Sequence, residues 1–137
     1  MTVDIAFEEL AEYVRKHYGK KLGFARVAAN EVCVTYEQRV FIATIQVPVN
    51  VTVDEVLPDS VAVTYSGKMG IDKIISGMLV FLMAKVPQLE ALVKVEEGHH
   101  LRINLNGLEE TRKVVDKVSL NDIEILENAV RVTAGLK

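Results

Sequence analysis

The 137-residue chain contains one cysteine, no tryptophan and only three prolines. A lone thiol, Cys33, excludes an internal disulfide, so a hydrophobic core has to hold the fold. Half of the residues are hydrophobic, and a chain of this length buries enough surface to be stable without a disulfide or a metal. We therefore expect a single domain that spans residues 1–137.

A strong charge of either sign is also missing, since the formal net charge is −3. The sequence therefore lacks the basic footprint that nucleic-acid binding requires, and we expect no nucleic-acid partner. The N-terminal segment carries Asp4, Glu8 and Glu9, where a secretory signal would need positive charge followed by an apolar run. We expect a soluble cytoplasmic protein, or an exported one whose signal has been removed.

Patterns typical of catalytic and metal sites are missing as well. His99 and His100 are adjacent, and because neighbours on a strand point to opposite faces, they do not converge as zinc ligands would. No serine lies in a G-x-S-x-G elbow, and no basic residue flanks Cys33 to activate its thiol. The sequence thus predicts a protein that is not an enzyme, with no catalytic residues, metal or cofactor.

One local basic cluster stands out against the weak net charge: Arg15, Lys16, His17, Lys20, Lys21 and Arg26. Such a cluster suits an anionic head group or a membrane surface. Compensation of the helix dipole at the C-terminal end of a helix, together with ordinary solubility, explains most of it. Membrane-surface contact remains one candidate role of this segment.

The first predicted helix covers residues 4–18. Phe7, Leu10, Val14 and Tyr18 recur at spacings of three and four and form one apolar face. Gly19 is a natural end for this helix. A shorter helix is predicted near residues 106–115, with Asn106 as its N-cap because Glu109 follows three residues later.

From about residue 27 to residue 65, apolar and polar residues alternate with the period of strands. We expect a turn near residues 37–38, followed by a strand with Phe41, Ala43, Ile45, Val47 and Val49 on one face. Two further hairpins are predicted, turning near residues 97–98 and 127–128, with a β-bulge near residues 121–122. Strict alternation favours antiparallel pairing.

A second helix is predicted for residues 71–85, within the stretch DKIISGMLVFLMAKVP. Only Ser76 and Gly77 interrupt the apolar residues between Ile74 and Ala84. A membrane span needs about 20 apolar residues, so we expect no transmembrane helix. A helix that is apolar around its circumference must nevertheless be covered on every side. A curved sheet, a second copy of the chain or an apolar ligand could provide that cover.

The order of elements resembles bacterial relatives of the tubular lipid-binding, BPI-like superfamily. The resemblance rests on the amphipathic start FEELAEYVRKHYG, the alternating strands EVCVTY, RVFIATIQVPV and SVAVTYSG, the apolar helix, and the closing hairpin VSLNDIEILENAVRVTAGL. It covers most of the chain as a pattern, without an invariant motif. It implies a highly curved sheet around a long helix, with a groove for acyl chains. Such proteins are typically exported or membrane-attached, whereas this chain shows no export signal.

The sequence therefore predicts an α+β fold, in which a curved antiparallel sheet wraps around an N-terminal helix and a central apolar helix. The first functional hypothesis is noncatalytic binding of a lipid or fatty-acid-like ligand in a groove between sheet and helix. The predicted lining residues are Ile74, Ile75, Met78, Leu79, Phe81, Leu82 and Met83 on the helix, and Phe41, Ile45 and Val47 on the sheet. The second hypothesis is a structural or interaction module that forms a homo-oligomer through the apolar helix.

Overall fold

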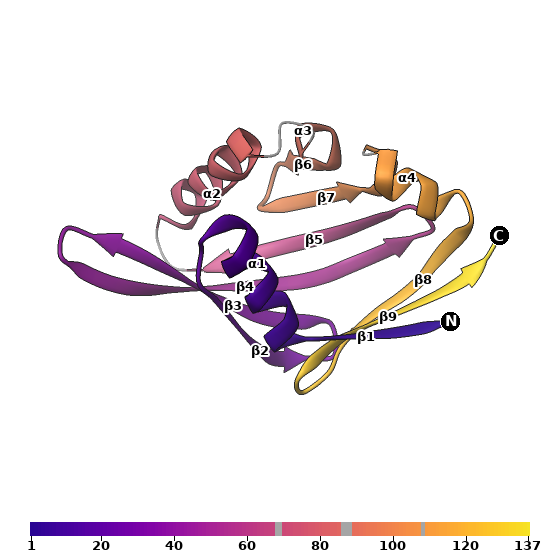
Figure 1. Cartoon of the computed structure of the whole chain (residues 1–137), viewed down its shortest axis with the longest axis horizontal. Helices are drawn as coiled ribbons and strands as arrows, with labels where there is room; N and C mark the ends of the chain where they lie inside the picture. Colours follow the sequence, from indigo (N-terminus) through magenta and orange to yellow (C-terminus); the bar gives the residue numbers. More distant parts are fainter. Residues whose placement is uncertain (68–69, 86–88, 108) are drawn as a thin grey trace.

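The computed structural model describes residues 1–67, 70–85, 89–107 and 109–137 of the chain (Figure 1). The fold is mixed helix and sheet, with two antiparallel sheets that curve without closing. The fold is mostly sheet with a few helices, which agrees in part with the predicted α+β class. The antiparallel pairing expected from the alternating pattern is confirmed for the described strands. The sequence did not predict the division of the strands between two sheets.

The smaller sheet has three strands in the order β1-β9-β8. They are β1 (Thr2–Ala6), β8 (Val118–Ile125) and β9 (Ala129–Leu136). The larger sheet has six strands in the order β2-β3-β4-β5-β7-β6. They are β2 (Leu22–Ala28), β3 (Glu31–Val40), β4 (Ala43–Leu57), β5 (Ser60–Gly67), β6 (Val93–Glu96) and β7 (His100–Asn104).

Four α-helices and one 3-10 turn lie among the described residues. They are α1 (Phe7–Tyr18), α2 (Ile71–Lys85), α3 (Leu89–Leu92), the turn η1 (Leu105–Gly107) and α4 (Glu109–Val115). In Figure 1, α2 lies toward the end of the molecule where the β3–β4 hairpin projects, and the two chain termini lie together at the other end. The bounds of α2 agree with the predicted helix.

The first helix begins later than the sequence suggested. Residues 4–6 belong to β1, which pairs with β9 so that Asp4 lies opposite Arg131. The Arg131 guanidinium donates to both Asp4 carboxylate oxygens, at 2.8 and 3.0 Å. This pairing partner is distant in sequence, and it overrides the local helical pattern of these residues. The predicted helix end is confirmed, because Gly19 has a left-handed φ of 66° and donates to the Arg15 carbonyl.

Two small apolar clusters form the core of the described chain. In the first, Phe7 of α1 packs with Val32 of β3 and Ile125 of β8, and the Phe7 ring stacks on Phe24 with 5.8 Å between ring centroids. This cluster joins α1 and both sheets. The second cluster, around Val49 and Tyr65, lies on the larger sheet under α2.

The predicted turn between β3 and β4 was wrong by about four residues. The register pairs Tyr36 with Val47 and Val40 with Ala43, so the turn consists of Phe41 and Ile42. Neither residue is a usual turn former. The turn was predicted at residues 37–38 because both are polar, but neither residue favours a turn conformation. Phe41 adopts a positive φ of 56° to make this turn, which is uncommon for a bulky side chain.

Other local predictions have mixed outcomes. The β-bulge near residues 121–122 is confirmed by the register shift between Leu120 and Asp122, and the hairpin turns fall where expected. The predicted N-cap at Asn106 was wrong, because this residue lies in η1 and its side chain donates to Asp59 instead. Strand β2 and the short helix α3 were missed.

Candidate apolar binding site

Helix α2 is strongly apolar, yet the fold covers the described part of it only partly. Among the α2 side chains that the structure describes, none is buried. Five large apolar side chains are partly exposed: Ile75, Met78, Leu79, Phe81 and Met83. Val80 is 68% exposed. The described part of α2 therefore exposes Val80 and parts of these five side chains to water.

The sheet face beneath α2 is apolar and forms the floor of the candidate site. Ile75 of α2 packs against the buried Val49 and Tyr65, together with Val47, Val51 and Leu101. These residues come from β4, β5 and β7, and strand alternation places them on one face. The contact through Ile75 fixes one turn of the helix over this floor.

Two aromatic contacts border the site. The Tyr65 ring stacks on His99, with 5.0 Å between ring centroids and 14° between the planes, and His99 has a positive φ of 63° in the β6–β7 turn. On the helix side, the Lys20 ammonium lies over the Phe81 ring at 4.4 Å. The segment after α1 thereby contacts α2.

The structure brings together some of the predicted lining residues but not all. Ile75 and Val47 belong to the same cluster, and Met78, Leu79, Phe81 and Met83 lie partly exposed along α2. The side chains of Ile74 and Leu82 lie outside the described part of the structure. Ile45 is 45% exposed on β4. Phe41 does not lie on the strand face as expected; it is 95% exposed in the turn, because the register continues both strands to residues 40 and 43.

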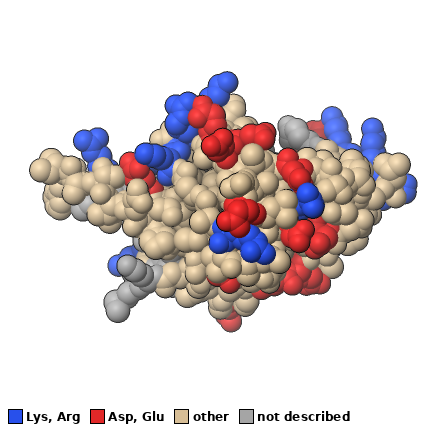
Figure 2. All heavy atoms as spheres, turned by 90° about the horizontal axis from the view of Figure 1, so that it is seen from below, with Lys and Arg blue, Asp and Glu red and all other residues tan. Residues whose placement is uncertain are grey.

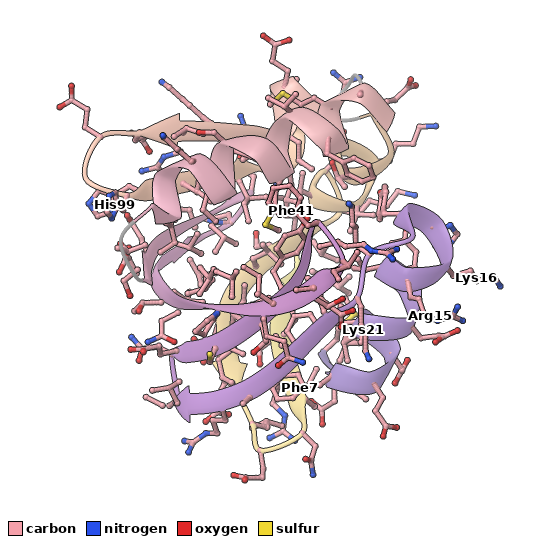
Figure 3. All side chains as sticks on the ribbon, turned by 90° about the vertical axis from the view of Figure 1, so that its left-hand side faces the viewer. Phe7, Arg15, Lys16, Lys21, Phe41 and His99 are labelled. Atoms are coloured by element: carbon pink, nitrogen blue, oxygen red, sulfur yellow. The ribbon has the colours of Figure 1, made fainter. Side chains whose placement is uncertain are left out.

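Sequence reasoning missed one feature next to this site. Beyond the sheet, β3 and β4 continue as a two-stranded ribbon that ends in Phe41 and Ile42. We call residues 38–45 the arm. Figure 3, which views this end of the molecule, labels Phe41 at the turn, and the Ile42 side chain is 97% exposed. The apolar sequence VFIA was the available signal, but it was read as part of a buried strand.

A polar cluster on the larger sheet does not have the geometry of a catalytic triad. The Thr64 hydroxyl contacts both the Asp54 carboxylate and His100 Nδ1. His100 Nδ1 also lies 3.8 Å from Asp54, so one ring nitrogen faces both oxygens. A triad needs the two ring nitrogens to face the nucleophile and the acid separately. These residues therefore act as a cross-strand polar contact.

Among the residues that the structure describes, no group of three His, Cys, Asp or Glu side chains could hold a metal ion. The two adjacent histidines differ in surroundings, since His99 stacks on Tyr65 while His100 contacts Thr64. They do not point to a common site.

The basic cluster after α1 is largely engaged in local contacts. Arg15 pairs with Glu12, Lys21 lies 3.7 Å from Glu37, and Arg26 donates to the Ile125 carbonyl at 2.9 Å. The open groove along α1, with a volume of about 830 Å³, is lined by carboxylates as well as cations. Figure 2 likewise shows both charges interspersed, while the projecting end at the left is largely uncharged. These contacts favour a role of the cluster in local stabilisation of the fold over binding of an anionic head group.

No described helix combines the length and the apolar character needed to cross a bilayer. Comparison with protein-family models finds no match. Neither the curated proteins nor the solved structures give a significant match to the chain.

Proposed function

We propose that the protein is a noncatalytic binder of a lipid-like or other apolar ligand. The ligand would lie between the curved larger sheet and α2. The observation that supports this proposal is that none of the described α2 side chains is buried, although the helix is apolar. A ligand that covers this surface would replace contacts with water.

The chemistry of the site fits an acyl chain better than a polar molecule. The floor includes Val47, Val49 and Leu101, and apart from Lys73 and Ser76 the described α2 side chains are aliphatic, aromatic or thioether groups. Each methylene transferred from water to such surroundings contributes about 0.8 kcal/mol. Methionines such as Met78 and Met83 repack around irregular apolar shapes, which suits ligands that vary in chain length.

Binding of a fluorescent fatty acid tests the proposal. We expect the delipidated protein to bind the probe, and Leu79→Ser to weaken binding about tenfold, because a truncated leucine loses about 1.5 kcal/mol of apolar contact. Leu79 lies one turn after Ile75 and therefore on the same helix face. The control is Leu136→Ser, since Leu136 is 84% exposed in β9 at the opposite end. Equal affinity of both variants would refute a ligand site at α2.

A second candidate function is self-association through α2, and the accessible surface favours it. The chain exposes 8836 Å², whereas a folded monomer of 15.2 kDa exposes about 7,100 Å² by the usual scaling with mass. The excess of about 1,700 Å² exceeds the roughly 800 Å² that each partner buries in a standard interface. We expect Val80→Asp to convert an oligomer into monomers, measured by light scattering, because an unpaired carboxylate would become buried.

A further inference from the structure

The arm is the least supported part of the described chain. β2 pairs with β3 only as far as Tyr36, and β5 pairs with β4 only from Val49. Among the described strands, the two halves of the arm therefore pair only with each other. An isolated two-stranded hairpin is marginally stable in water. A projecting ribbon of this kind calls for an additional contact.

The apolar residues of the arm are arranged as a contact surface. Cross-strand register places Ile45 and Ala43 on the same face as Val47 and Val49. This face continues outward from the floor of the α2 site to the turn, where Phe41 and Ile42 are 95% and 97% exposed. Phe41 holds its ring there at a positive φ, and such strained conformations cluster at functional sites.

We propose that the arm of one copy docks on α2 of a second copy, and that the exchange is reciprocal. This inference rests on the second candidate function, self-association, and it adds the element that the partner contributes. The partly covered α2, with Val80 68% exposed, and the exposed arm are both apolar and lie toward the same end of the molecule. A two-fold axis at this end would cover both surfaces of both copies at once.

Surface area and charge favour a second copy over a bilayer. The whole-chain surface excess of about 1,700 Å² is large enough to contain the roughly 800 Å² that each partner buries in a standard protein interface. An anionic bilayer also needs unpaired cations beside the inserted tip. Here the arm carries a single cation, Arg39, rather than a basic cluster, and the net charge of the chain is −3.

The Phe41→Gly variant separates association from folding. Glycine adopts a φ of 56° without strain, so we expect the variant to keep or gain thermal stability as a monomer. Removing the ring should weaken association at least a hundredfold, measured by sedimentation velocity across micromolar concentrations. Leu136→Ser, at the opposite end, should remain a dimer with wild-type affinity. A monomeric wild-type protein, or a Phe41→Gly variant that still dimerises, would overturn the proposal.

Disulfide trapping tests the reciprocal contact. In a Cys33→Ser background, an Ile42→Cys chain and a Val80→Cys chain are purified separately, mixed and oxidised. We expect a covalent 42–80 heterodimer, since the arm of one chain reaches α2 of the other. Failure of the mixture to cross-link while the Ile42→Cys chain cross-links to itself would overturn the proposed contact.

Two further outcomes identify a different occupant. A monomeric wild-type protein that binds phosphatidylglycerol vesicles, with binding lost in Phe41→Gly, would overturn the proposal in favour of a bilayer. A dimer that survives Phe41→Gly but is lost in Val80→Asp would overturn the role of the arm and leave self-association through α2 intact. Fatty-acid binding by the monomeric Phe41→Gly variant reports separately on the ligand site.

Discussion

Replacing Gly107 by alanine should strongly destabilise the protein, because the turn η1 lies directly against helix α3. A Cβ atom added at Gly107 would lie 2.1 Å from the Ala91 carbonyl oxygen and 2.5 Å from its carbonyl carbon. Both atoms belong to the backbone, so no side-chain rotation relieves the overlap. The two segments would have to separate by about 1 Å to restore ordinary contact.

Overpacking that moves side chains costs about 1–3 kcal/mol, and a backbone overlap should lie at or above the top of that range. We therefore expect Gly107→Ala to lose about 3 kcal/mol, out of a total of about 5–15 kcal/mol for a domain. For a chain of this size, the loss lowers the melting temperature by roughly 10 °C. Thermal and urea denaturation followed by circular dichroism measure both quantities.

The matched control is Gly77→Ala in the middle of α2. A Cβ added there meets nothing within 4 Å, and alanine is favoured over glycine in a helix by about 1 kcal/mol. The same chemical change should therefore raise the melting temperature by about 3 °C. Wild-type stability of Gly107→Ala, or equal losses in both variants, would refute the packing of α3 on η1.

Two more predictions concern the junction of α1 with the sheets. Phe7→Ala should lose about 3–5 kcal/mol, because Phe7 is buried against Val32 and Ile125; a loss below 1 kcal/mol in urea titration would contradict this core. The hydrogen bonds from Arg131 hold the pKa of Asp4 below its ordinary value. The pair therefore stabilises the fold above about pH 4, and this contribution is lost as the pH falls through the lowered pKa. Asp4→Asn should therefore lower the melting temperature at pH 7 and reduce the acid dependence; identical melting-temperature profiles from pH 2.5 to 7 would exclude a role for the pair.

The elements that sequence analysis placed well are those with a strong local pattern. The limits of α2 followed from its apolar composition, and the bulge at residues 121–122 followed from the shift of apolar residues between Leu120 and Ile123. In both segments, local periodicity and the final packing favour the same structure, so the pattern was sufficient.

The errors occur where a distant partner decides the structure. Residues 4–6 have a helical pattern but pair with β9, more than 120 positions away. The β3–β4 turn falls on Phe41 and Ile42 because cross-strand pairs such as Tyr36 with Val47 set the register. No turn-forming residue marks that position, so local propensity could not find it.

The candidate site was predicted in part for the same reason. The apolar character of α2 is visible in the sequence, and Ile75 and Val47 do pack against the same buried cluster. The exposure of α2 and of Phe41 depends on how far β2 and β5 extend beside the arm. That extent is set by the pairing of the strands, whereas the apolar sequence VFIA alone favoured a buried strand.

Native mass spectrometry of the purified protein tests the central claim most directly, because the claim is that the apolar surface of α2 requires a cover in addition to the fold. We predict a mass above that of the single 15.2 kDa chain, either by a bound apolar molecule or by a second copy. A spectrum that contains only the bare monomer at micromolar concentration, from protein that has not been delipidated, would contradict the account.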